Sequence, residues 1–369
     1  MAWHIYDAYC IVNDMAAIWV FGATGLSGRA IARELVREGA DVVLIGRDED
    51  KLASVGRSIG GSAHQRVVSG LTTLVELIRA EKPDVVVNAV GPYGKTGPPL
   101  ARACLAAGAH YVDQANELEP VQQLLELDAE ARGREVTLLT GAGFGVLATE
   151  ALVVELRGGR SPAARAMVAA LPAVQRLGSS VLASAVDAIA YGGRRYRDGR
   201  LVRRRLGADH ERIPVPHAPA RHALAVPTGE LEAARRASGA GDVLAYSSEV
   251  PTGPIVRAVL PAVSALLAVR PIRGGIQRLI SRMRLTPPAK AGDVSWAYAR
   301  LEWADGSRRE AWLRTGEGYA FTARVAALAA ERLGDGTAVP GAFTPGALFG
   351  AELAKLAGGE IVTPREANA

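Results

Sequence analysis

The chain has 369 residues, enough for about two domains with a sizeable core. Hydrophobic residues make up 49% and charged residues 22%, as in a folded enzyme-sized protein rather than a disordered or fibrous chain. The net charge is only +5, from 43 Lys and Arg against 38 Asp and Glu, which suits a site for an anionic ligand and argues against a nucleic-acid-binding platform.

Cysteine use and the first residues bound the class of protein further. Cys10 and Cys104 are the two cysteines, with no spacing typical of a disulfide scaffold or a zinc site. We therefore expect no metal and a cytoplasmic location. Residues 1–15 lack the basic start and the long apolar run of a signal peptide, and they precede the first predicted strand. We expect them to form an N-terminal extension outside the fold.

Strands and helices alternate through the first 150 residues. Short apolar runs predict strands, and amphipathic segments between them predict helices that end at Gly39 and Gly108. We expect the helix before Gly108 to begin at Pro98-Pro99, since proline fits a first helical turn. This rhythm predicts an α/β fold: a doubly wound parallel sheet of the Rossmann type over residues 16–150. The predicted strands are 18–21, 42–45, 66–69, 84–90, 110–113 and 136–140, and the predicted helices are 30–37, 48–59, 71–80, 98–107 and 119–132.

The rhythm changes after residue 157. A strand at 165–171, a helix at 179–190 and two strands at 293–304 and 307–315 around Asp305-Gly306 lack alternating crossovers. These elements predict a second α+β domain with a mixed or antiparallel sheet, a substrate or dimerisation domain over 151–315. Residues 191–229 give no clear pattern. A helix at 319–333 belongs to a C-terminal segment, 316–369.

Three glycines stand between the first predicted strand and its helix. Such a turn holds a pyrophosphate, because the backbone approaches closely and the first helical N–H groups are unpaired. Glycine is frequent in this chain, so the strand and helix around the turn carry the signal. The alternative is a turn needed only for packing. The residues predicted to bind the phosphates are Gly22, Ala23, Thr24, Gly25, Leu26, Ser27 and Gly28.

Arg47 follows the second predicted strand, where the second phosphate of the cofactor is selected. An acid there would hold a free ribose 2′-hydroxyl and favour NAD. A guanidinium pairs with a 2′-phosphate instead. We therefore predict NADP(H) in preference to NAD(H). Asp48, the next residue, is predicted to cap the following helix, with some use of NAD as the alternative.

The fourth predicted strand leads into Asn88-Ala89-Val90-Gly91-Pro92-Tyr93-Gly94-Lys95-Thr96. Its Gly-Lys-Thr ending resembles a phosphate loop, but Ala89 replaces the first glycine and Gly97-Pro98-Pro99 would separate Lys-Thr from the helix. We predict instead that this loop lies at the nicotinamide, with Asn88, Val90, Gly91 and Pro92 beside the cofactor. Tyr93 is the candidate proton donor or orienting group. Lys95 in that role, or a turn without chemistry, are the alternatives.

Polar residues also follow the fifth predicted strand. Asp113 ends that strand and is predicted to face the cofactor, and Asn116 and Glu117 follow in the same crevice. Glu117 could equally cap the next helix. The six histidines show no spacing of a ligand set or of a nucleophile's base, and His110 is expected to be structural.

Two further segments concern surfaces. The apolar run 259–269 is too short to span a bilayer and leads into a basic amphipathic stretch, 276–285. We expect a buried or interfacial helix, with packing or a dimer contact as one interpretation and contact with a membrane surface or a lipid substrate as the other. The arginines of 194–205 form either a solvated surface or a contact for phosphate, an acidic substrate or lipid headgroups.

Together these motifs resemble the saccharopine dehydrogenase-like oxidoreductases, and in particular the bacterial branch that includes trans-acting enoyl reductases. The resemblance rests on the glycine turn up to Arg29, on Asn88 to Gly94, and on His110-Tyr-Val-Asp113-x-x-Asn116-Glu117. Three further motifs also resemble that branch: Val226-Pro227-x-Gly229, 316–323 and Phe343-Thr344-Pro345-Gly346.

The resemblance implies a Rossmann domain, a second α/β domain over the nicotinamide, and a C-terminal segment (316–369) that packs back on the first domain. It also implies NAD(P) use and often a homodimer. Members reduce imines formed from amino acids, or carbon–carbon double bonds of polyketide or lipid precursors. The predicted function is an NADP(H)-dependent reductase that delivers hydride to a C=C or C=N bond of a small or lipid-like substrate. The alternatives are a saccharopine dehydrogenase-type imine reductase and a non-catalytic NADP(H)-binding sensor or scaffold.

Overall fold

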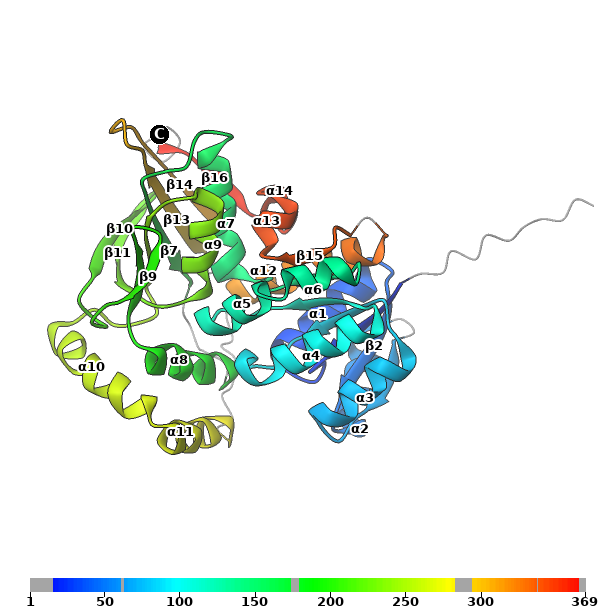
Figure 1. The fold of residues 1–369 in the computed structure, drawn as a ribbon. Helices are drawn as coiled ribbons and strands as arrows, with labels where there is room; N and C mark the ends of the chain where they lie inside the picture. Colours follow the sequence, from blue (N-terminus) through cyan, green and yellow to red (C-terminus); the bar gives the residue numbers. More distant parts are fainter. Residues whose placement is uncertain (1–15, 61–62, 174–178, 283–293, 337, 365–369) are drawn as a thin grey trace, which may run out of the picture.

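The protein is described by a computed structural model that covers residues 16–60, 63–173, 179–282, 294–336 and 338–364. Two β-sheets lie side by side, each with helices packed on it (Figure 1). The predicted extension, residues 1–15, is outside the described residues.

The first sheet has seven parallel strands in the order β15-β6-β5-β4-β1-β2-β3. Side chains alternate between its two faces: Val42 and Leu44 enter one core, Val43 and Ile45 the other. The predicted doubly wound parallel sheet is confirmed. Its strands are β1 (Ala17–Phe21), β2 (Asp41–Gly46), β3 (His64–Val67), β4 (Val85–Asn88), β5 (His110–Asp113), β6 (Thr137–Leu139) and β15 (Gly341–Phe343).

Helices cover both faces of this sheet. On one face lie α1 (Leu26–Arg37), α2 (Glu49–Ile59) and α12 (Gly318–Gly334). On the other lie α3 (Leu71–Glu81), α4 (Tyr93–Ala107), α5 (Leu118–Leu125) and α6 (Asp128–Gly133). Helix α12 packs on α1 and on strands of this sheet, so this part of the C-terminal segment lies against the first sheet.

Helix α4 begins at Tyr93, not at Pro98-Pro99 as predicted. Pro92 takes the N-cap position, and both later prolines lie inside the helix. The side chain of Thr96 explains the early start, because its hydroxyl donates to the Val90 carbonyl and accepts from Asn88 Nδ2. These contacts fix the first turn onto the preceding loop and offset the cost of proline within the helix.

The helix predicted at 119–132 is two helices, α5 and α6, with a break at Glu126-Leu127. The second helix is turned toward β15, where Asp128 Oδ1 accepts the Ala342 N–H at 2.9 Å. The break between α5 and α6 therefore depends on a contact with a residue some 200 positions later in the chain, which the local hydrophobic periodicity cannot predict.

The second sheet is mixed, as predicted. Its order is β10-β11-β12-β7-β13-β14-β16, with β8 and β9 joined at β12, and β7 and β12 run parallel while the other pairs are antiparallel. The predicted hairpin around Asp305-Gly306 is confirmed, and four strands fill the unassigned stretch 191–229. The strands are β7 (Arg165–Leu171), β8 (Arg194–Arg197), β9 (Arg200–Arg203), β10 (His210–Val215), β11 (Ala218–Ala225), β12 (Asp242–Ser247), β13 (Ser295–Glu302), β14 (Arg308–Thr315) and β16 (Glu360–Val362).

One hydrophobic core runs from the first sheet into the second. Helix α7 (Phe144–Arg157) leaves β6 and packs on β13 and β14, beside α9 (Gly229–Ser238). The short helices α13 (Pro345–Phe349) and α14 (Glu352–Leu356) then cover α7. The C-terminal segment thus adds β15 to the first sheet and β16 to the second, which the helical pattern does not predict.

A third layer consists of helices α8 (Ser179–Tyr191), α10 (Pro254–Ala268) and α11 (Arg270–Arg282). Helices α10 and α11 both pack on α8 and form the lower left border of the molecule (Figure 1). Residues 259–268 of the predicted apolar helix lie within α10, and Val269 caps its C-terminus. The basic stretch 276–285 begins in α11, and its last residues are outside the described part.

Candidate functional site

The carboxyl ends of four neighbouring strands meet at one edge of the parallel sheet. Phe21 of β1 is in register with Ile45 of β2 on one side and with Asn88 of β4 on the other, and Asn88 is in register with Asp113 of β5. Ligands of open α/β sheets bind outside this edge. The turn after β1, Arg47 after β2 and the loop after β4 therefore lie along this one edge of the sheet.

The glycine turn is built for close approach. The Gly22 N–H donates to the Ile45 carbonyl at 3.0 Å, and Gly22 has a φ of +85°. A Cβ at Gly28 would lie 2.2 Å from the Gly22 oxygen, so only glycine lets α1 start this close to β1. No side chain caps α1, and its first turn holds no acid. Its leading N–H groups and positive dipole end are thus available to a phosphate.

The other predicted phosphate residues flank this turn. Ala23 is buried behind it, whereas Gly25 and Leu26 are exposed and Thr24 and Ser27 are half-buried. The backbone around Ala23 is anchored by its N–H, which donates to the Ile45 carbonyl at 3.3 Å. The turn is therefore held from the β2 side, and its Gly25 and Leu26 are exposed.

Arg47 is exposed at the end of β2. Within the described residues its guanidinium makes no hydrogen bond and no ion pair, so it is available to an anion. The neighbouring Asp48 caps α2, accepting from the Lys51 N–H at 3.0 Å and pairing with Lys51 Nζ at 2.7 Å. These contacts lower the pKa of the Asp48 carboxyl, and they fit its predicted capping role.

The loop after β4 is held by a chain of side-chain hydrogen bonds. Buried Asn88 donates from Nδ2 to Thr96 Oγ1 and to the Tyr111 hydroxyl, both at 3.0 Å, and its Oδ1 accepts the Val90 N–H. Asn88 therefore shapes the loop through Val90, Gly91 and Pro92. A Cβ at Gly91 would approach Ser184 of α8 to 3.5 Å, so the second domain borders this loop.

The prediction that Gly97-Pro98-Pro99 separates Lys-Thr from the helix is wrong, because α4 begins directly at the loop and contains these residues. This spacing therefore does not exclude a phosphate loop at Gly94-Lys95-Thr96. However, the Thr96 hydroxyl is bonded to Val90, and Lys95 Nζ donates to Gln277 Oε1 of α11 at 3.2 Å. Both side chains are engaged by the protein itself.

Asp113 continues the same network. Its Oδ1 accepts the Thr140 hydroxyl and the N–H groups of Ala115 and Gly141, and its Oδ2 accepts the Tyr111 hydroxyl. The carboxyl is 2% exposed, and burial raises its pKa to about 6 against the opposing effect of these bonds. Asp113 thus ties the ends of β5 and β6 together and holds Tyr111 against Asn88.

Tyr93 is the first residue of α4 and is 8% exposed. Its ring joins the core between the sheet and helices α3 to α5. Its N–H donates to Glu117 Oε1 at 3.4 Å. Burial and the charges of Asp113 and Glu117 raise the pKa of the phenol, which keeps it protonated.

Sequence reasoning missed a buried acid from the second domain. Glu230, near the start of α9, is 3% exposed, and burial raises its pKa to about 7. With its nitrogen oriented toward this carboxyl, the Asn116 amide donates to Glu230 Oε2 at 2.8 Å. Gly229 N–H donates to the Asn116 carbonyl. The signal was Val226-Pro227-x-Gly229 just before it, but nothing in that motif marks the acid as buried.

The C-terminal motifs have structural contacts next to this edge. The Thr322 hydroxyl accepts the N–H of Phe144, just after β6. Thr344 donates to Glu150 of α7, which also accepts the Gly346 N–H at 2.7 Å. Burial raises the pKa of Glu150 to about 7. His110 likewise has a structural contact, since its Nδ1 accepts the Thr137 N–H.

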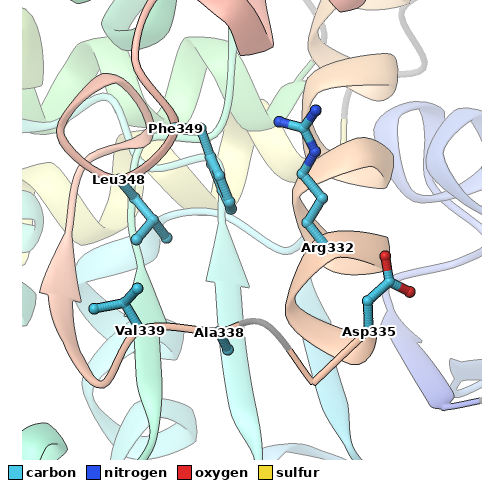
Figure 2. A pocket seen from close by; sticks show the side chains of 6 residues that line it. All are labelled: Arg332, Asp335, Ala338, Val339, Leu348 and Phe349. Atoms are coloured by element: carbon cyan, nitrogen blue, oxygen red, sulfur yellow. The ribbon is translucent and has the colours of Figure 1, made fainter.

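A separate surface pocket lies where the end of α12, the residues before β15 and helix α13 meet (Figure 2). None of the predicted site residues lines it. Its lining residues are Arg332, Asp335, Ala338, Val339, Leu348 and Phe349. Among the described residues, no group of three or more His, Cys, Asp or Glu is placed to hold a metal ion.

Comparison with known proteins agrees with the resemblance seen in the motifs. Residues 18–139 match the family model described as saccharopine dehydrogenase NADP binding domain. A trans-acting enoyl reductase of Mycobacterium bovis is 30% identical over 145 residues, 38% of this chain and 35% of that protein. A trans-acting enoyl reductase of Mycobacterium leprae is 32% identical over 134 residues, 34% of this chain and 32% of that protein. The chain thus spans about a third of the length of these relatives.

The fold has a counterpart among solved structures. Apo saccharopine dehydrogenase (L-Glu forming) from Saccharomyces cerevisiae aligns with 93% of this chain and 96% of its own, at a TM-score of 0.57 and 16% identity. This likeness covers both sheets and concerns the fold alone.

Proposed function

We propose that this chain, whose residues 18–139 match the saccharopine dehydrogenase NADP-binding domain family, is an NADP(H)-dependent oxidoreductase. Its proposed reaction is hydride transfer to a C=C (enoyl) or C=N bond of a small or lipid- or polyketide-like substrate. The observation that carries the proposal is the carboxyl edge of the first sheet. The uncapped start of α1 and the guanidinium of Arg47, which has no partner among the described residues, follow neighbouring strands there.

The residues at this edge suit a dinucleotide phosphate. Gly22, Gly25 and Gly28 let the backbone approach, and the first N–H groups of α1 would bind the pyrophosphate. Arg47 would pair with a 2′-phosphate, which supports a preference for NADP(H) over NAD(H). Val90, Gly91 and Pro92 would border the nicotinamide, in a loop that Asn88 and Asp113 hold in place.

When bound, a reduced nicotinamide supplies the hydride, and such transfer needs little from side chains beyond orientation and one proton donor. Tyr93 remains our proposed donor or orienting group, because its phenol stays protonated beside the loop. Glu230 is the second proton-bearing group of this region, with a pKa near neutrality. The enoyl reductase names of the relatives favour a C=C bond over a C=N bond.

NADPH oxidation across a panel of enoyl thioesters and imines tests this proposal. We expect turnover on at least one enoyl substrate, and a Tyr93→Phe variant that binds NADPH normally but has a kcat lowered by ~10²-fold or more. Tight binding of NADPH with no turnover on any substrate would instead indicate the sensor or scaffold alternative. Turnover confined to imines of amino acids would support the saccharopine dehydrogenase-type activity.

A further inference from the structure

Helix α10 has an exposed face made of apolar side chains. Its outward residues recur at helical spacing and are all apolar. Exposed fractions are 80% for Ile255, 50% for Val259, 52% for Leu266 and 47% for Val269. The inward face, through Leu260 and Leu267, packs toward the protein. Scattered exposed apolar residues are ordinary, but a continuous stripe of them along one helix marks a contact surface.

Helix α11 follows α10 directly, also exposes apolar side chains and adds positive charge. Ile272 and Leu279 are 37% and 65% exposed, and the flanking Arg270 and Arg278 are exposed as well. The segment 254–282 contains five arginines and no Asp or Glu. An apolar stripe with an arginine-rich border is the pattern of a helix that lies in the interface of an anionic lipid bilayer.

The turn before β10 adds to the same surface. Leu206 packs with Leu260 of α10, and Arg257 Nε donates to the Gly207 carbonyl at 3.0 Å. The exposed Arg205, which precedes Leu206 in the chain, is therefore close to α10. This contact connects the end of the arginine-rich stretch 194–205 with the same surface.

No single described helix is long and apolar enough to cross a membrane; α10 and residues 270–280 pass that test together but are bent by 100°. A bent pair exposing one apolar face is suited to lying on a surface. A second copy of the chain fits this face less well, because in a twofold contact the arginine-rich segment 254–282, which has no Asp or Glu of its own, would face itself.

We infer that the α10–α11 face binds the surface of an anionic lipid bilayer, with its apolar stripe at the headgroup–acyl boundary and its arginines among the headgroups. The inference rests on the exposed residues and their charge, and it stands independently of the proposed reaction. It also places the membrane next to the candidate site, since α11 contacts Lys95 and α8 borders Gly91.

Flotation of the full chain with phosphatidylcholine vesicles, with and without phosphatidylglycerol, tests the inference. We expect binding to the anionic vesicles that weakens as salt is raised. The double variant Arg270→Glu/Arg278→Glu should bind at least ~10-fold more weakly, and Ile255→Asp/Leu266→Asp should lose binding. The matched control is Val339→Asp/Leu356→Asp, which changes residues 50% and 42% exposed elsewhere and should bind as the wild type does. Urea denaturation, measured without vesicles, verifies that each variant is folded.

Three outcomes would overturn the inference. The first is wild-type protein that floats with neither kind of vesicle. The second is equal binding to neutral and anionic vesicles, with no effect of the arginine substitutions. The third is a concentration-dependent dimer, seen by sedimentation, that the aspartate variants abolish without any vesicle binding; this result would assign the face to a second copy. None of these outcomes bears on hydride transfer, which is assayed separately.

Discussion

The polar groups at the two ends of the candidate site have opposite hydrogen-bonding states. At the proposed phosphate end, the first N–H groups of α1 are uncapped and Arg47 is unpaired within the described residues. At the proposed nicotinamide end, Asn88 and Asp113 are buried and engaged with Tyr111, Thr140 and the backbone. One end keeps its groups ready for a ligand, and the other uses them to fix its own shape.

Sequence motifs do not distinguish these two kinds of residue, those available to a ligand and those hydrogen-bonded within the protein. Removing a ready group should weaken the ligand and leave the fold intact. Removing an engaged group should unfold the loop first, because its buried partners lose their hydrogen bonds. Asp113 and Asn88 are therefore expected to act on the cofactor through the loop that they position.

The largest effect is expected for Asp113→Ala. The change leaves the Tyr111 and Thr140 hydroxyls and two buried N–H groups without their acceptor, so the free energy of unfolding should fall by ~4 kcal/mol. Urea denaturation measures it. The control Asp50→Ala, exposed in the first turn of α2, should cost at most ~1 kcal/mol. If the Asp113 variant were as stable as the wild type, Asp113 would not be one of the residues that hold the fold at this edge.

The next effect is a pH dependence of stability. Burial raises the pKa of Glu230 and of Glu150 from 4.5 to about 7 in the folded protein. Between pH 4.5 and 7 the folded state therefore binds more protons than the unfolded chain, so the free energy of unfolding falls as pH rises through this window. For Glu230 alone the loss is up to ~3 kcal/mol.

Glu230→Gln isolates this contribution. The variant should lose less stability than the wild type between pH 4.5 and 7, since its amide does not ionise. Glu76→Gln, an exposed change in α3, should follow the wild-type curve. Comparing variants removes terms that both share, such as His110, whose lowered pKa acts in the opposite direction. If the curves of unfolding free energy against pH were parallel for wild type and Glu230→Gln, the pKa of Glu230 would not be raised in the folded protein.

The smallest effect on the fold belongs to Arg47→Ala. Loss of a charged pair with a 2′-phosphate should weaken NADPH by ~10–100-fold, leave NADH nearly unchanged and leave stability within ~0.5 kcal/mol of wild type. Titration calorimetry with both cofactors measures this. Arg57→Ala, at the far end of α2, controls for the loss of one positive charge. Equal weakening of both cofactors would contradict the NADP assignment.

The parts of the fold that sequence predicts well are those fixed by local pattern. The β-branched run at Val42 to Ile45 is buried on both faces of a parallel sheet, and Asp305-Gly306 directs a hairpin without help from distant residues. The parts that it missed depend on partners far along the chain. Helix α4 starts early because Thr96 binds Val90, and α5 breaks from α6 because Asp128 holds Ala342.

The candidate site divides in the same manner. The glycine turn and Arg47 could be predicted because each is marked by a short local pattern: glycines between a strand and a helix for the turn, and the end of an apolar strand for Arg47. Glu230 could not, because its burial follows from Asn116, more than a hundred residues earlier, and from Gly145 packing beneath it. Likewise the apolar run at 259–269 indicated a helix, but only its packing on α8 shows which face remains exposed.

The pairing of β15 with β6 and of β16 with β14 has a consequence for biosynthesis. Strand β15 emerges about 200 residues after β6, which at ~5–20 residues per second is a delay of ~10–40 s. Until then the nascent cofactor domain carries an unpaired strand edge, the kind of surface that recruits foreign strands. An excised fragment ending near residue 150 would keep that edge permanently, so expression of the intact chain is the sounder route to material for every measurement above.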